Sequence, residues 1–97
     1  MSQTSILTLR NLGLNSSNVA VIAAILKDEK KHNSDSITSI SFSYNPLIGD
    51  LGAKAIVKNL PKSVIEIGLV DCGIDDLGGY HILTWMKKSP ALEMICI

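Results

Sequence analysis

The chain has 97 residues, of which 46% are hydrophobic but only 4% aromatic, and its nine basic and nine acidic side chains cancel to a formal net charge of zero. This length predicts one small domain over residues 1–97, and the composition predicts an aliphatic core. The absence of net positive charge argues against nucleic acid as a partner.

The first strand is expected within residues 5–14, SILTLRNLGL. Leu7 and Leu9 alternate with polar residues, which is the pattern of a half-buried strand. Leu12 and Leu14 continue the inward-facing spacing into a turn. Ser16, Ser17 and Asn18 are then candidates for the N-cap of a helix.

That first helix carries an apolar stripe at the i, i+3, i+4, i+7 spacing. The stripe consists of Val19, Ile22, Ala23 and Leu26. We expect the helix to end within Lys27–Lys31, where cations suit the negative end of the helix dipole. A polar loop, residues 32–36, follows.

A second strand is expected at about residues 38–43, with a turn over residues 45–49. Asp50 is expected to cap a helix that reaches about Asn59 and that Pro61 terminates. The expected inward-facing residues of this unit are Ile37, Ile40, Phe42, Asn45 and Leu47 before the helix and Ala53, Ile56, Val57 and Leu60 within it.

A third strand is expected at residues 65–70, with a turn at Cys72–Gly73 and a helix capped by Asp75 or Asp76. The inward-facing residues expected in this unit are Val64, Ile67, Leu69, Cys72 and Ile74 before the helix and Ile82, Leu83 and Met86 within it. Residues 92–97 begin a fourth unit, of which only the strand is present, with Leu92, Ile95 and Ile97 at the apolar positions.

Strand positions recur at nearly constant spacing along the chain. Leu7 to Ile40 is 33 residues, Ile40 to Ile67 is 27 and Ile67 to Ile95 is 28. The predicted repeats are therefore residues 4–36, 37–63, 64–91 and the partial unit 92–97. Because each connection between strands contains a helix, the strands should run parallel. Stacked units of this kind bury a core that none could bury alone.

These residues resemble a leucine-rich repeat protein of the ribonuclease-inhibitor-like subclass. The pattern IxxIxFxxNxL at 37–47 followed by GDLGAKAI, and VxxIxLxxCxI at 64–74 followed by DDLGGYHIL, carry the resemblance, and LxxIxI at 92–97 opens another copy. It implies an α/β solenoid of about three and a half repeats, with parallel strands on the concave face and helices on the convex face. The first unit departs from the pattern, since Leu12 replaces Asn or Cys and Asn18 replaces Gly, and PLIGD in the second unit has one extra residue.

The turn between each strand and its helix needs a polar inward-facing side chain, because the bend leaves backbone groups unpaired. Asn45 offers two donors and an acceptor for this purpose, and Cys72 offers a weak donor. We therefore expect Asn45 to be buried and bonded to the backbone of neighbouring turns. Leu12 can do neither, so the first turn must be satisfied in another way.

No residue is predicted to be catalytic, to bind a cofactor or to bind a metal. Asp75 and Asp76 are adjacent acids, but they stand where a helix cap is expected and have no third ligand at useful spacing. His32 and His81 have no Ser or Cys partner at a recognisable spacing, and the glycines form neither GxxxxGK[ST] nor GxGxxG.

A binding face is predicted instead on the outward-facing strand positions and the residues that follow them. This predicted set consists of Thr8, Arg10, Asn11, Ser39, Ser41, Ser43, Tyr44, Glu66, Val70, Asp71, Met94 and Cys96. Small serines flanked by Arg10, Tyr44 and Met94 resemble an adaptable contact surface. Two alternatives stay open: a neutral sheet face without a partner, and a binding rim formed by the lysines at the helix ends.

The expected function is that of a non-catalytic module that binds a protein through its concave face. The alternatives are an assembly element that self-associates through the strand edge at Leu92–Ile97, a fragment of a larger leucine-rich repeat protein and, distantly, an enzyme. Two cysteines do not make a disulfide framework. No apolar run approaches the ~20 residues of a membrane span, and the N-terminus lacks a signal-peptide pattern. We therefore expect a cytoplasmic protein that binds neither membrane nor nucleic acid.

Overall fold

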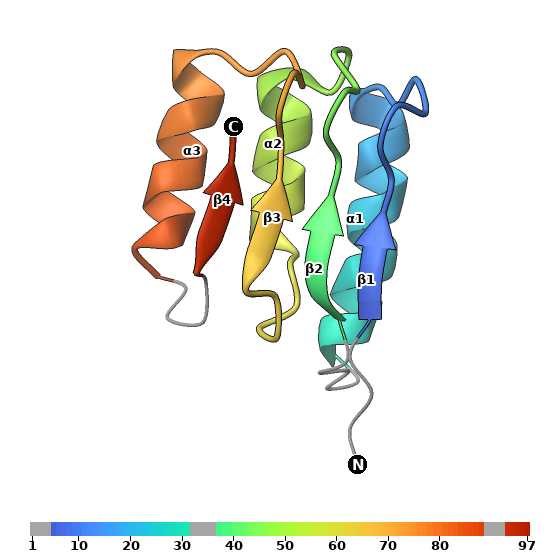
Figure 1. Cartoon of the computed structure of the whole chain (residues 1–97), viewed down its shortest axis with the longest axis vertical. Coiled ribbons are helices and arrows are strands. Elements are labelled where there is room, and N and C mark those ends of the chain that lie inside the picture. The colour runs from blue at the N-terminus through green and yellow to red at the C-terminus, as the bar shows by residue number, and fades with distance from the viewer. Residues whose placement is uncertain (1–4, 32–36, 89–92) are drawn as a thin grey trace.

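The computed structural model describes residues 5–31, 37–88 and 93–97, and within them strands and helices alternate along the chain. These described residues form four strands and three helices, whose arrangement can be followed in Figure 1. Their bounds are β1 Ser5–Thr8, α1 Ser16–Lys31, β2 Ile37–Ser41, α2 Gly49–Lys58, β3 Glu66–Gly68, α3 Asp76–Met86 and β4 Met94–Cys96. The predicted order of elements is confirmed, although β2, β3 and β4 are shorter than the predicted strands.

The four strands form one parallel sheet in the order β1-β2-β3-β4. Leu7 pairs with Ile40, Ile40 with Ile67 and Ile67 with Ile95. These are the positions that the sequence spacing matched, so the predicted register and the parallel direction are confirmed.

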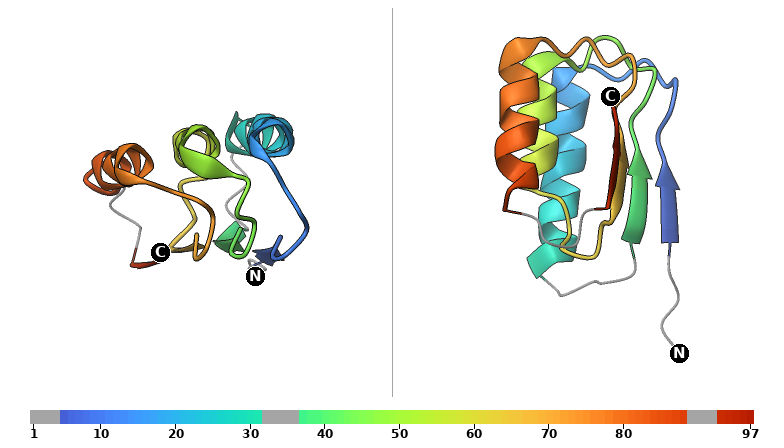
Figure 2. Two further views of the ribbon diagram at one scale, coloured as in Figure 1. Left: turned by 90° about the horizontal axis from the view of Figure 1, so that it is seen from above. Right: turned by 60° about the vertical axis from the view of Figure 1, so that its left-hand side comes forward.

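All three helices cover one face of the sheet, and no described element covers the other (Figure 2). Between the two layers lies an aliphatic core, to which Phe42 contributes the one buried aromatic ring among the described residues. The stripe predicted for α1 faces this core, with Val19, Ala23 and Leu26 buried and Ile22 partly buried. The layered arrangement follows from the sequence, because each strand and each helix has one apolar side to bury.

Asn45 is buried at the turn after β2 and holds two neighbouring turns together. Its Oδ1 accepts hydrogen bonds from the backbone N–H groups of Leu12 (2.9 Å) and Leu14 (3.1 Å). Its Nδ2 donates to the carbonyl oxygens of Leu9 (2.8 Å) and Phe42 (2.7 Å). The predicted role of Asn45 is confirmed, and the first turn, which has Leu12 at this position, is satisfied by the asparagine of the next unit.

Cys72 stands at the corresponding place after β3 and is also buried. Its thiol donates to the carbonyl oxygen of Phe42 (3.1 Å), so this unit too bonds the turn that precedes it. Burial raises the pKa of the Cys72 thiol, because the thiolate would lose its hydration there.

Asp75 is the N-cap residue of α3, as one of the two predicted positions, whereas the positions predicted to cap α1 and α2 are wrong. Asn15 caps α1, since its Oδ1 accepts from the N–H of Asn18 while Asn18 Oδ1 accepts from the N–H of Asn15, both at 2.9 Å. This reciprocal pair is an Asn–Asn version of the capping box. Asp50 lies inside the first turn of α2, which begins at Gly49, and its Oδ1 accepts from the N–H of Asp75 (2.7 Å) in the next unit. The N-cap residues of α2 and α3 are Ile48 and Asp75, and the side chain of neither makes a capping hydrogen bond.

Four predicted inward-facing residues are exposed, and one of them is Ile97, which follows β4. Leu47 is 67% exposed and Ile48 only 1%, because the extra residue in PLIGD shifts the inward position by one. Leu12 is exposed because no described unit precedes the first turn. Leu83 is exposed because no described helix follows α3.

Candidate functional site

The candidate site is the face of the sheet that no described helix covers, which we call the open sheet face. A hollow of about 350 Å³ lies on it. Nine of the twelve predicted binding residues line this hollow: Thr8, Arg10, Ser39, Ser41, Ser43, Tyr44, Glu66, Val70 and Cys96. Ile6 and Gly68 also line it and are not in the predicted set, although the strand alternation places both on this face.

Arg10 and Tyr44 form a pair at the edge of the hollow. The guanidinium carbon of Arg10 lies 5.0 Å from the centre of the Tyr44 ring, within the range of a cation–π contact. Both side chains are exposed, so the pair presents a cation and an aromatic edge to solvent. Residues 10 and 44 become neighbours because β1 pairs with β2.

Tyr44 has a left-handed backbone conformation, with φ of 65°. Asn11 and Asp71, which stand at the same place after β1 and β3, have φ of 53° and 54°. Asn and Asp tolerate this conformation because their short side chains bond locally, whereas a tyrosine there is strained by roughly 1–2 kcal/mol. Of the three corresponding residues Asn11, Tyr44 and Asp71, only Tyr44 is a residue type that this backbone conformation does not favour.

Ser43 lines the hollow, and its hydroxyl oxygen is engaged within the sheet. Its side chain is buried, and its Oγ accepts a hydrogen bond from the N–H of Val70 (3.0 Å). Ser41 Oγ in turn accepts a long bond from the N–H of Ser43 (3.4 Å). These serines tie the end of β2 to its neighbour and make the floor of the hollow rigid.

The floor also depends on Gly68 in β3. A Cβ atom at this position would stand 2.9 Å from Ser41 Oγ and 3.0 Å from Ser43 Oγ, closer than side chains normally approach. Because Gly68 has no side chain, the hollow stays open at this position, and Arg10 and Glu66 also line it. Ser39 Oγ donates to Glu66 Oε1 (2.9 Å), which orients that carboxylate on the face.

The remaining predicted residues lie around this centre. Met94 is half exposed and Cys96 is exposed on β4, and Cys96 has a free thiol. Asn11 and Asp71 are exposed at the turns. Met94, Asn11 and Asp71 do not line the hollow, so the structure brings the predicted set together in part.

Residues 5–31, 37–88 and 93–97 contain no group of three or more His, Cys, Asp or Glu side chains close enough to hold a metal ion. They also contain no helix that is long and apolar enough to cross a membrane. The hollow on the open sheet face is lined by serine and threonine hydroxyls, the Arg10 cation, the Glu66 carboxylate, the exposed Tyr44 ring and the free thiol of Cys96.

Comparison of the chain with known protein families, curated proteins and solved structures found no significant match.

Proposed function

We propose that this chain is a leucine-rich repeat module that binds a protein partner through the open sheet face, as the concave face of a short solenoid. The observation that carries the proposal is the Arg10–Tyr44 pair, whose tyrosine is held in a left-handed conformation that a tyrosine disfavours. Strain of this kind persists where function requires the side chain, since stability alone would select another residue.

The chemistry of the pair suits recognition of a protein. Arginine and tyrosine are the residue types that most often carry the binding energy of an interface, because each combines a large contact area with hydrogen-bonding groups. Pairing of β1 with β2 and of β2 with β3, with Ser43 bonded to Val70, holds the surrounding backbone in place, so little entropy is lost on binding. The small serines and Gly68 allow the partner to approach the sheet closely.

A photo-crosslinking amino acid at position 44 tests the proposal in cells of the source organism. We expect it to capture one specific protein, whereas the same amino acid at exposed Lys58 on α2 should not. The captured protein is then titrated against Tyr44→Asn. This variant removes the ring and takes the residue type that the first unit has at the same place, so it should weaken binding about tenfold, or 1.4 kcal/mol, while the domain stays folded.

The lysine rim is the competing site and has its own variant. Lys54→Ala with Lys58→Ala removes two of its charges and should leave binding unchanged. If the lysine pair abolishes binding, and Arg10→Ala with Tyr44→Ala leaves it intact, the open sheet face is the wrong surface. A dependence on salt that follows the lysines would point the same way.

A further inference from the structure

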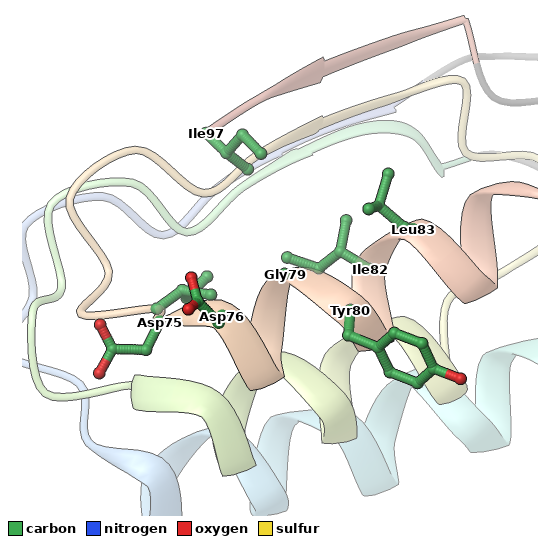
Figure 3. Close-up of a pocket in the computed structure, with 8 residues that line it drawn as sticks. Asp75, Asp76, Gly79, Tyr80, Ile82, Leu83 and Ile97 are labelled. Carbon is green, nitrogen blue, oxygen red and sulfur yellow. The ribbon is translucent and has the colours of Figure 1, made fainter.

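A second hollow, of about 550 Å³, lies at the opposite end of the molecule from β1, between α3 and the end of β4 (Figure 3). Its lining is mainly apolar and includes Ile74, Tyr80, Ile82, Leu83 and Ile97. We call the surface formed by α3 and β4 on this side the C-flank. In Figure 3 Leu83 and Ile97 approach the hollow from the helix and from the strand.

The same positions are buried in the preceding units. Leu83 lies five residues after Gly78 and is 58% exposed, whereas Val57 lies five residues after Gly52 and is 3% exposed. The difference is that α2 has α3 beside it. The strand shows the same effect, since Ile97 is 71% exposed although Phe42 and Leu69, at its place in β2 and β3, are buried. The C-flank is therefore a surface of the kind that neighbouring units bury against each other, and no described unit covers it.

Gly52 in α2 and Gly78 in α3 show which side of each helix faces the preceding unit. A side chain at Gly52 would meet Ser16 and Ile48, and a side chain at Gly78 would meet Asp50 and Ile74, so both glycines face the preceding unit. Residues three and seven positions further along a helix share that side.

In α1 the residue at the glycine position is Asn18, and the residues three and seven positions later are Val21 and Ile25. Both are large apolar residues, and both are exposed. In α3 the place of Ile25 is taken by Trp85, which packs against the core. We call the surface formed by α1 and β1 on this side the N-flank. It has the apolar character of a helix face that receives a preceding unit.

The N-flank and the C-flank each also contain a strand edge that has no neighbouring strand. Within the described sheet, β1 and β4 each have one neighbour, so each has one edge without a strand. All strands run in the same direction, and a copy placed by continuing the stack would set its β1 parallel to β4. The free edges would then be paired, which removes two exposed rows of backbone donors and acceptors.

We propose that copies of this chain associate head to tail, with the N-flank of one copy packed on the C-flank of the next. The contact continues the interface that already joins α1 to α2 and α2 to α3 within the chain. Since the two flanks are different surfaces, the contact is heterologous and can propagate.

Charge placed on either flank tests the proposal. Leu83→Glu should disable the C-flank and Ile25→Glu the N-flank, while Leu51→Glu puts the same charge on an exposed apolar position of α2, away from both ends. Circular dichroism confirms folding of each variant. Sedimentation velocity and light scattering then measure mass from low micromolar to near-millimolar concentration.

The wild type and Leu51→Glu should form a concentration-dependent series of oligomers, and each flank variant alone should be monomeric. An equimolar mixture of Leu83→Glu and Ile25→Glu should give a dimer of twice the monomer mass, because it contains one intact N-flank and one intact C-flank. A monomeric wild type, association of either flank variant alone, or a mixture that stays monomeric would overturn the proposal. If the wild type is monomeric, the partner that covers the C-flank would instead be a strand–helix unit of a different protein.

Discussion

Replacing Asn45 by alanine should be the most informative single truncation in this domain. The amide of Asn45 is buried and bonds backbone groups of two turns. Alanine removes every one of these bonds at once and leaves the polypeptide otherwise unchanged. The loss in the free energy of unfolding therefore measures how strongly this one side chain holds the first unit to the second.

The loss of stability depends on which of these backbone groups can find another hydrogen-bond partner. The carbonyl oxygen of Phe42 still accepts from the Cys72 thiol, and Leu12 is exposed, so its N–H can bond water. The carbonyl oxygen of Leu9 and the N–H of Leu14 are only partly buried but lose this partner. Each unpaired buried group costs about 1–3 kcal/mol, so we expect a total of about 3 kcal/mol.

Urea unfolding at equilibrium measures this loss. With a slope of roughly 1–3 kcal/mol per molar for small proteins, the midpoint should fall by about 1–3 M. Asn59→Ala is the matched control, because its Nδ2 makes one bond, to the carbonyl oxygen of Ala55, at the end of α2. It should cost no more than about 1 kcal/mol. Equal losses for the two variants would refute the argument that Asn45 joins the turns.

An aspartate at position 45 separates the two halves of the amide. It keeps an acceptor for Leu14 but faces the carbonyl oxygens of Leu9 and Phe42 with a negative charge. The folded state should therefore raise the pKa of this carboxyl. Asn45→Asp should accordingly regain stability relative to the wild type as the pH falls through that raised pKa, because the protonated acid can donate again.

Three further perturbations test other parts of the structure. Tyr44→Asn should stabilise the domain by about 1 kcal/mol in urea unfolding, because relief of a left-handed tyrosine outweighs a lost cation–π contact; a loss of stability would mean that the conformation is not strained. Gly73 has φ of 67°, and a Cβ there would collide with a carbonyl of the preceding turn, so Gly73→Ala should cost about 2–3 kcal/mol of stability. Gly13 has the same φ with open space around it, so Gly13→Ala should cost about 1 kcal/mol. Equal shifts in melting temperature for the two variants would contradict the predicted collision at Gly73. Because the pKa of Cys72 is raised in the fold, stability should fall as the pH rises past the ordinary thiol value, and this fall should be smaller in Cys72→Ser, so parallel pH profiles would contradict it.

Much of this fold could be predicted from the sequence because apolar residues recur with the period of the structure. Leu7, Ile40, Ile67 and Ile95 occupy matching places in the chain, and they pair across the sheet as their spacing predicts. Asn45 could be recognised as a turn residue for a similar reason, since a polar side chain at an inward position must find polar partners. Both inferences concern which side of the backbone a residue faces, and that is a local property.

Tertiary structure decided which of those residues have a neighbour. Leu83 and Ile97 repeat an inward pattern and are nevertheless exposed, because burial at these positions depends on a following unit. Ser43 was expected on the surface but is buried, and its hydroxyl oxygen accepts the N–H of Val70, which follows the adjacent strand β3. The contact of Arg10 with Tyr44 likewise exists only after β1 and β2 have paired. Periodicity in a chain determines orientation, whereas burial and contact depend on what the fold places beside each residue.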